Sequence, residues 1–332
     1  MKTISGLSLL GSLALSCAVS AQTPADAVRS YIEAARTFAG NDHAFVFGRL
    51  CETPIASVNA PPVTGEVPAA LPIIDPEREW YAEPAKVFDD LFFLGQTGFS
   101  VWGLRTTDGI ILVDAIFDYS VEAEVIGGLR KLGIDPAEIK YLIISHAHGD
   151  HSGGAAFLQK QGARVIMSEA DWDLYENSNA PEKASRNIVA TDGMEITLGN
   201  STVKVFITPG HTHGTISTLL PVHDNGEPHV AAVWGGTLFN FRDNPDDPRD
   251  LRLRDYAQSA VHFQAMTAIN GADVILSNHT AYDGTTVKLP LLNQREIGDP
   301  HPYVIGQDAV NRYLKVAESC AIAARIAEAS GL

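Results

Sequence analysis

Three histidines and one aspartate lie within six residues, in the segment Ser145-His146-Ala147-His148-Gly149-Asp150-His151. Neutral imidazoles and carboxylates are ligands that zinc prefers in proteins. His146 and His148 are two residues apart, so on an extended backbone both rings point to the same side, whereas Asp150 and His151 follow a predicted bend and can face a second point. Two neighbouring metals can share and activate a water for hydrolysis. The spacing therefore predicts a two-metal hydrolytic site.

The flanking sequence predicts the elements that position these side chains. Residues 141–144 are apolar and partly β-branched, which is typical of a buried strand, and residues from Gly153 onward are typical of a helix start. A polar loop that is rich in histidine by chance is the alternative interpretation. The strand before the motif and the glycine pair after it favour the metal site.

The pattern His-x-His-x-Asp-His resembles the signature of the metallo-β-lactamase superfamily. That family has a further histidine after a later strand and another near the end of the domain. Here the alternating segment 203–208 runs into His211, and the apolar segment 274–276 runs into His279. The resemblance implies two zinc ions per chain, with these ligands: His146, His148 and His211 for the first ion, and Asp150, His151 and His279 for the second. Asp150 would also be catalytic, because it would orient the attacking hydroxide.

One position separates reactions within that superfamily. Lactonases, glyoxalase II enzymes and phosphodiesterases of this fold usually carry a metal-bridging aspartate in a Gly-Asp-Thr-Leu-Phe segment. The matching stretch here is Gly235-Gly236-Thr237-Leu238-Phe239, which has no carboxylate. Because true β-lactamases also lack that aspartate, the resemblance favours them.

The complete ligand sets, which contain no cysteine, resemble the third subclass of class B β-lactamases, and the resemblance covers most of residues 85–325. It implies a zinc-dependent hydrolase that opens the amide of β-lactam antibiotics with a metal-bound hydroxide. A hydrolase of a lactone, ester or thioester, with weak or no β-lactamase activity, is the alternative, because Phe239 stands where the subclass often has a second serine. A non-catalytic binding protein of this fold should have lost ligands, whereas all six are present.

Four further side chains are candidates around the metals. Thr237 would supply a hydroxyl near the second metal, and His213 and Arg242 are candidates for substrate binding. Asp114 follows a predicted strand where the family has an aspartate that orients a metal-bound imidazole. A turn or capping role for Asp114 is an equally open interpretation.

The order of predicted elements indicates an α/β domain. Strand patterns at 99–104 and 110–113 are followed by a helix over 122–132, and long helical patterns cover 253–270 and 308–329, with a charged loop over 242–252. Hairpins followed by alternating strands and helices are typical of layered α/β domains. Together with the resemblance, they predict a four-layer αββα sandwich, with a single catalytic domain over 85–332.

The N-terminal region predicts secretion. Lys2 precedes the apolar run Leu7–Val19, which ends in small residues and is too short to span a bilayer, so residues 1–21 are predicted to be a cleaved signal peptide. The mature protein would then be periplasmic or secreted, without membrane insertion; lipoprotein processing at Cys17 is the alternative. Residues 22–84 form a predicted extension, with one helix beginning at Thr23-Pro24 and a proline-rich irregular segment.

Signal cleavage would leave two cysteines, Cys51 and Cys320. In an oxidising compartment they can form a disulfide if the N-terminal extension packs on the C-terminal helix. Two buried free thiols are the alternative.

The charge balance limits the class of partner. The 332 residues carry a formal net charge of −16, whereas nucleic acids and anionic membranes are bound through an excess of lysine and arginine. We therefore expect a monomer that acts on a small-molecule substrate.

Overall fold

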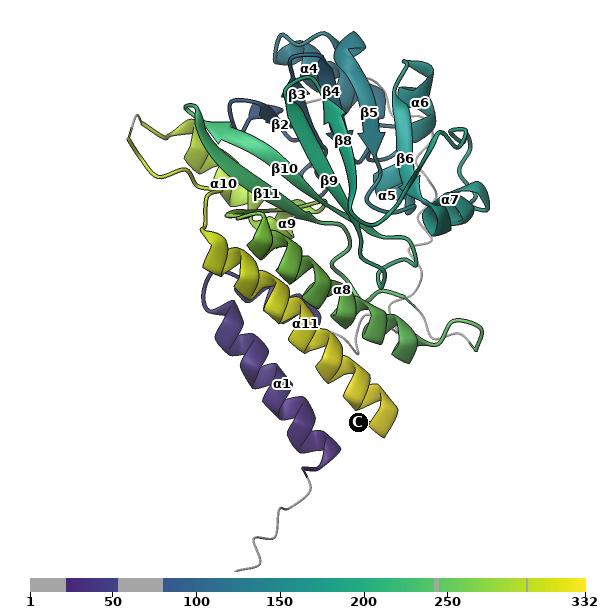
Figure 1. Ribbon diagram of the computed structural model, residues 1–332, viewed down its shortest axis with the longest axis vertical. Coiled ribbons are helices and arrows are strands. Elements are labelled where there is room, and N and C mark those ends of the chain that lie inside the picture. The colour runs from purple at the N-terminus through teal and green to yellow at the C-terminus, as the bar shows by residue number, and fades with distance from the viewer. Residues whose placement is uncertain (1–21, 53–79, 242–244, 297) are drawn as a thin grey trace, which may run out of the picture.

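The computed structural model describes residues 22–52, 80–241, 245–296 and 298–332. The predicted signal peptide, the proline-rich segment 53–79 and Arg242 lie outside these residues. Two β-sheets pack face to face and helices cover the outer side of each sheet (Figure 1). This arrangement confirms the predicted α/β sandwich in a single domain.

The first sheet has seven strands in the order β1-β2-β3-β4-β5-β6-β7. Strands β1 to β4 pair antiparallel, and β4 to β7 pair parallel. The strands are β1 Ala85–Lys86, β2 Leu91–Phe93, β3 Trp102–Thr106, β4 Gly109–Val113, β5 Ile139–Ile143, β6 Arg164–Ser168 and β7 Ile188–Ala190. Since parallel strands need a crossover connection, helices separate β4, β5, β6 and β7 along the chain.

The second sheet has five strands in the order β12-β11-β10-β9-β8, in which only β11 and β12 pair parallel. The strands are β8 Met194–Leu198, β9 Ser201–Ile207, β10 Ile216–Asp224, β11 Glu227–Trp234 and β12 Val274–Ser277. The long helix α8 (Arg249–Ile269) provides the crossover between β11 and β12. Candidate ligands His211 and His279 follow the ends of β9 and β12.

The helical segments are α1 Pro24–Ala39, α2 Ala44–Phe47, η1 Gly48–Glu52, η2 Glu122–Ile126, α4 Gly127–Lys131, η3 Pro136–Glu138, α5 Gly149–Ser152, α6 Ala155–Lys160, α7 Glu169–Glu176, α8 Arg249–Ile269, α9 Thr280–Asp283, α10 Thr285–Asn293 and α11 Gln307–Ser330. Helix α8 begins at Arg249, one turn before the predicted start, so the prediction of a loop up to residue 252 was wrong. Pro248 directly precedes this helix, where its fixed φ of −62° leads the chain into the first turn.

Three apolar cores separate the four layers. In β4, Ile110 and Leu112 belong to the core under η2, α4, α6 and α7, whereas Ile111 and Val113 belong to the core between the sheets. This alternation explains the continuous apolar run of the strand, because a strand that is buried on both faces needs no polar side. The third core lies between the second sheet and the helices α1, α8 and α11.

The N-terminal extension is part of this third core. Thr23 caps α1 by accepting a hydrogen bond from the backbone N–H of Asp26, as the sequence predicted. Helix α1 lies along α11 (Figure 1), and a Cys51–Cys320 disulfide joins η1 to α11, which confirms the predicted bond.

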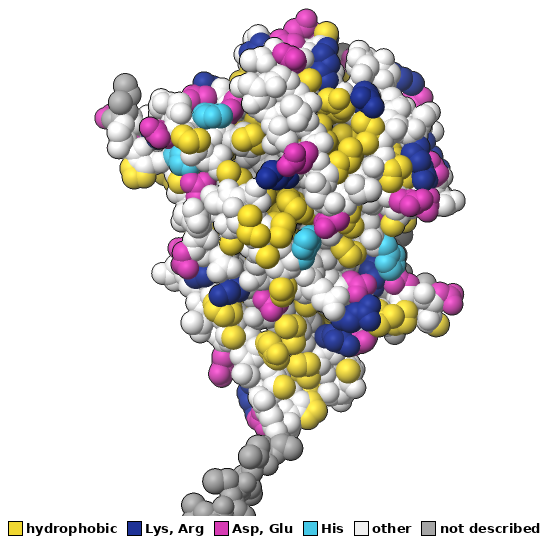
Figure 2. Space-filling model, viewed as in Figure 1, with side chains coloured by type: hydrophobic (Ala, Val, Ile, Leu, Met, Phe, Trp, Pro, Cys, Tyr) yellow, Lys and Arg dark blue, Asp and Glu magenta, His cyan; other side chains and the backbone are white. Residues whose placement is uncertain are grey.

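The outer face of this helical layer carries apolar side chains between charged ones (Figure 2). A cavity of about 890 Å³ between α1, α8 and α11 has Ala257, Val261 and Ile322 in its lining. The two groups of potential metal ligands lie elsewhere, so this cavity is not the candidate site.

Candidate metal centre

The candidate centre lies at the edge where several strands end. Strand β5 ends at Ile143, and the chain then passes His146 and His148 before α5 begins at Gly149. Asp114 follows β4, which pairs parallel with β5, and His279 follows β12. The sheets therefore bring together groups that are up to 165 residues apart in the chain.

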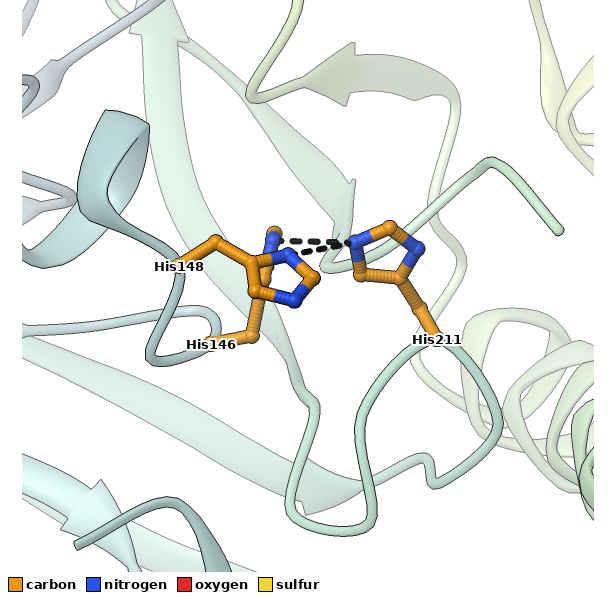
Figure 3. A group of neighbouring side chains, drawn as sticks. All are labelled: His146, His148 and His211. Carbon is orange, nitrogen blue, oxygen red and sulfur yellow. Dashed lines mark hydrogen bonds between the residues drawn. The ribbon is translucent and has the colours of Figure 1, made fainter. Parts of the chain in front are cut away.

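The first group consists of His146, His148 and His211 (Figure 3). Nε2 of His211 lies 3.1 Å from Nε2 of His146 and 3.1 Å from Nδ1 of His148. The ring of His146 is nearly perpendicular to the other two, so the three ring nitrogens converge on one point.

Backbone carbonyls fix the orientation of two of these rings. Nδ1 of His146 donates to the carbonyl of Gly235 at 2.9 Å, and Nδ1 of His211 donates to the carbonyl of Leu238 at 2.7 Å. With the proton on Nδ1, each neutral ring presents the lone pair of Nε2 to the centre. The backbone thus selects the tautomer that can bind a metal.

The second group consists of Asp150, His151 and His279. Nε2 of His151 lies 3.2 Å from Nε2 of His279 and 3.3 Å from Oδ2 of Asp150. Nε2 of His279 lies 3.7 Å from the same carboxylate oxygen. His151 is buried, whereas Asp150 and His279 are partly open to the cavity.

Asp114 orients the second group through a hydrogen bond to His151. Its carboxylate accepts hydrogen bonds from Nδ1 of His151 at 3.0 Å, from the Ser145 N–H at 2.7 Å and from the Ser145 hydroxyl at 2.9 Å. Asp114 has a positive φ of 68°, a conformation that Asp and Asn tolerate better than most residues. It lies where the resemblance places an aspartate that orients an imidazole.

Burial and charge set the protonation states of the centre. Burial lowers the pKa of His146 and of His211 well below the ordinary value, and it lowers the pKa of His279 to about 4. Burial acts in the same direction on His151, but the carboxylates of Asp150 and Asp114 outweigh it and raise the pKa of His151 to about 10. The first group is therefore neutral at pH 7, which is the state that binds metals.

The donor sets fit zinc. Tetrahedral zinc with Zn–N distances of about 2.0–2.1 Å separates two ligand nitrogens by roughly 3.3 Å. The distances between the presented atoms are 3.1 Å in the first group and 3.2–3.7 Å in the second. These distances suit one tetrahedral cation in each group.

Gly236 explains the missing bridging carboxylate. A Cβ at this position would lie 2.5 Å from the Cβ and 2.8 Å from the Cγ of His211, closer than real Cβ contacts. The backbone of Gly236 packs directly against the His211 side chain, so an aspartate does not fit at this position unless His211 moves.

Asp171 is a supporting residue that the sequence analysis missed. From α7, its carboxylate accepts hydrogen bonds from the Ala147 N–H at 2.9 Å, the Thr212 hydroxyl at 2.9 Å and the Gly214 N–H at 3.2 Å. It ties the motif to the loop that carries His211. Burial raises its pKa to about 6, against the opposing hydrogen bonds. Its hydrogen-bond partners lie in distant loops, so only the packing of α7 in the fold shows the role of Asp171.

The predicted substrate-binding residues do not all lie in one cavity. Thr237 lines the cavity of about 260 Å³ over the two groups, although it is only 2% exposed. His213 lines a neighbouring cavity of about 250 Å³, and its Nε2 lies 3.1 Å from the Asp247 carboxylate. Asn240 lines both cavities and was not predicted. Arg242 lies outside the described residues, so its predicted role stays a prediction.

Comparison with known proteins gives the class. Residues 96–224 match the family model of the metallo-beta-lactamase superfamily, and the chain carries a domain of this superfamily. The fold of this superfamily implies a divalent metal, which agrees with the two groups of potential ligands.

One solved structure is similar to this chain over most of its length. A subclass B3 metallo-beta-lactamase of Bradyrhizobium japonicum has a TM-score of 0.63 and 25% identity, over 74% of this chain and 95% of that one. This similarity confirms the predicted affinity to the third subclass.

Curated relatives have other activities. A hydroxyacylglutathione hydrolase of Neisseria gonorrhoeae is 28% identical over 46% of this chain and 64% of its own length. An N-acyl homoserine lactonase of a Bacillus species is 29% identical over 36% of this chain and 48% of its own length. The chain thus spans less than two thirds of either relative. No helix among the described residues is both long and apolar enough to cross a membrane.

Proposed function

We propose that this protein is a two-zinc hydrolase that opens the amide of β-lactam antibiotics. The first zinc would be held by His146, His148 and His211, and the second by Asp150, His151 and His279. The observation that carries the choice of substrate is the packing of Gly236 against His211, which leaves no room for the bridging aspartate of lactonases and glyoxalase II enzymes. The similarity to a subclass B3 enzyme over nearly its whole length supports the same choice.

The bound metals and the side chain of Asp150 would have different roles in the reaction. Zinc ions bound there would lower the pKa of a water and polarise the substrate carbonyl. Burial opposes ionisation of Asp150, but the charge of His151 holds the pKa of Asp150 well below the ordinary range when no metal is bound, and a bound zinc would supply that positive charge instead. Asp150 is therefore ionised and partly exposed in the cavity, where it accepts a hydrogen bond from the attacking water and orients it. The water oxygen would form a bond to the carbonyl carbon and the C–N bond of the ring would break. One proton of the water passes to the ring nitrogen, which becomes an amine, and the other leaves to solvent as the carboxylate forms.

The Asn278 side chain lines the same cavity, but its role is structural. Its Nδ2 donates to the Gly235 carbonyl at 2.7 Å and to the Ser145 hydroxyl at 3.1 Å. These bonds link β12 to the motif loop and keep His146 and His279 in register. Because both donors are used, we assign Asn278 no contact with the substrate.

A hydrolase of a lactone, ester or thioester is the second candidate. It is favoured by the curated relatives, a hydroxyacylglutathione hydrolase and a homoserine lactonase. The same water, oriented by the same Asp150, would attack an ester or thioester carbonyl, so the metal centre does not separate the two candidates.

The test is hydrolysis by the purified protein, zinc-loaded and then chelator-treated. The substrates are a penicillin, a cephalosporin, a carbapenem, an acyl-homoserine lactone and an acyl-glutathione thioester. We expect chelator-sensitive turnover of a β-lactam with kcat/KM of about 10⁴ M⁻¹s⁻¹ or more. Efficient turnover of only the lactone or thioester would replace the first candidate by the second.

The Cys51–Cys320 disulfide supports a site of action outside the cytoplasm, because such bonds persist in oxidising compartments. We propose the periplasm as that compartment. Fractionation of the native host, with the disulfide state measured by thiol alkylation, tests this: an exclusively cytosolic and reduced protein would contradict it.

A further inference from the structure

Arg252 holds the backbone of the His211 loop. It lies near the start of α8 with a residue exposure of 7%. Its Nε donates to the carbonyl of Gly210 at 2.9 Å, and its Nη2 donates to the carbonyl of His211 at 2.5 Å. The two peptide groups that follow Gly210 and His211 are thereby fixed to a helix of 21 residues.

Two neighbours hold the guanidinium itself, and a third residue holds one of them. Its Nη1 donates to Oδ2 of Asp247 at 2.7 Å, and the guanidinium carbon lies 4.8 Å from the ring centroid of Phe241. Oδ1 of Asp247 lies 3.1 Å from Nε2 of His213. A buried arginine that is paired and stacked in this way keeps one orientation, and its charge is compensated by Asp247.

The clamp formed by Arg252 and Asp247 holds His211, the ligand of the first group that comes from a different sheet. His146 and His148 belong to the same short segment after β5, so their separation is fixed locally. His211 arrives from another sheet, on the loop between β9 and β10, and must hold its Nε2 at 3.1 Å from both partners. Asp171 fixes the same loop from α7.

We propose that Arg252 is a positioning residue for the first metal, which it serves by clamping the His211 backbone, with Asp247 and His213 completing the clamp. The inference rests on the metal centre of the proposed function and is independent of the substrate. It also gives His213 a task in the clamp, where the sequence suggested contact with substrate.

The clamp requires the shape of arginine. Two carbonyls and a carboxylate lie in different directions around one planar group, and the guanidinium reaches all three at once through Nε, Nη1 and Nη2. A lysine ammonium at the same position is a point charge on a flexible stem and reaches fewer of them. Removing the group altogether leaves buried carbonyls without donors.

The test measures metal affinity in the full chain. Zinc binding to Arg252→Met, Arg252→Lys and Asp247→Asn is measured by competition with a chromophoric chelator, and cobalt(II) binding by its absorption spectrum. Arg254→Met is the matched control, because Arg254 lies on the same helix and pairs with the adjacent Asp255 at the surface. Circular dichroism of each metal-free variant checks that it is folded.

We expect Arg252→Met to bind the first metal, which is held by His146, His148 and His211, at least tenfold less tightly than wild type, in the range found for residues that orient metal ligands. Arg252→Lys and Asp247→Asn should fall between Arg252→Met and wild type, with altered cobalt spectra, and Arg254→Met should match wild type. If Arg252→Met does not fold, Arg252→Lys and Asp247→Asn decide the question alone. Wild-type affinity in the folded Arg252 and Asp247 variants would overturn the proposal, as would an equal loss in Arg254→Met.

The same experiment separates this inference from the proposed function. Weakened metal binding in the clamp variants, in a protein that hydrolyses no β-lactam, would uphold the clamp and refute the substrate. Efficient β-lactam hydrolysis with unchanged metal affinity in the variants would uphold the proposed substrate and refute the clamp.

Discussion

The backbone of Gly236 lies against the side chain of His211, so closely that a Cβ at residue 236 would be 2.5 Å from the Cβ of His211. One glycine thereby decides two properties of the centre. It gives His211 the space to lie beside His146 and His148, and it excludes a carboxylate side chain from residue 236.

Gly236→Ala should therefore displace His211 and lower both metal content and turnover, by tenfold or more, and Gly236→Asp should do so more strongly without creating lactonase activity. Metal content after dialysis and turnover of each variant are the measurements. Gly149→Ala is the matched control, because a Cβ there meets nothing within 4 Å. A Gly236→Asp variant with full metal content and new lactonase activity would refute this explanation.

Asp114→Asn tests the support of His151. Asn tolerates the positive φ at this position, so the backbone is retained while the charge is lost. An amide nitrogen or oxygen in place of Oδ2 disturbs the bond that orients His151, and we expect second-site metal affinity to fall 10–100-fold. Chelator competition measures it, with the exposed Asp118→Asn as control; equal affinities in the two variants would contradict the assigned role.

The buried Asp283 should make stability depend on pH. Burial raises its pKa to about 6 from 3.8, against hydrogen bonds from Ser277 and Thr285. Between pH 4 and 6 the unfolded chain loses this proton while the folded chain keeps it, so the contribution of Asp283 to the free energy of unfolding falls as pH rises, by about 3 kcal/mol at most. The lowered pKa values of the buried histidines His146, His211 and His279 act in the opposite direction.

Relative to wild type, Asp283→Asn should therefore become more stable as pH rises from 4 to 6, as measured by urea unfolding of metal-free protein at pH 4, 5 and 6. The exposed Asp118→Asn should keep the wild-type pH dependence. The same pH dependence in wild type and Asp283→Asn would show that Asp283 does not contribute to it.

The disulfide should stabilise the fold without affecting catalysis. Cys51 and Cys320 close a loop of 269 residues and belong to the core under the second sheet, which contains no candidate ligand. We expect the double variant Cys51→Ala/Cys320→Ala to lose about 2–5 kcal/mol of unfolding free energy, with kcat/KM within twofold of wild type. Reduced wild type should behave like the variant in urea unfolding; identical stabilities of oxidised and reduced protein would rule out this contribution.

The close approach of the six candidate ligands was predictable, because a dense motif and two later histidines each follow a strand pattern that ends at one edge. The helices α9 and α10 were not predicted. Helix α9 has only four residues, and Pro290 lies inside α10, where a proline ordinarily indicates the end of a helix.

Supporting residues were harder to predict than ligands. Asp171 and Arg252 act on backbone groups of distant loops, and a contact with a backbone carbonyl or N–H leaves no pattern in the sequence. The packing of Gly236 on His211 depends in the same way on how the segment after β11 approaches the loop after β9. Cys51 and Cys320 left two interpretations open, which only the packing of α1 on α11 separated.

The most direct measurement is the hydrolysis of a penicillin or carbapenem by metal-free protein that is titrated with zinc. Turnover should be absent without zinc and should reach its maximum by about two equivalents per chain, while His279→Ala, folded by circular dichroism, should stay inactive at every zinc level. β-Lactam turnover by the metal-free protein, or none at any zinc level alongside efficient hydrolysis of a lactone or thioester, would contradict the assignment of a two-zinc β-lactam hydrolase.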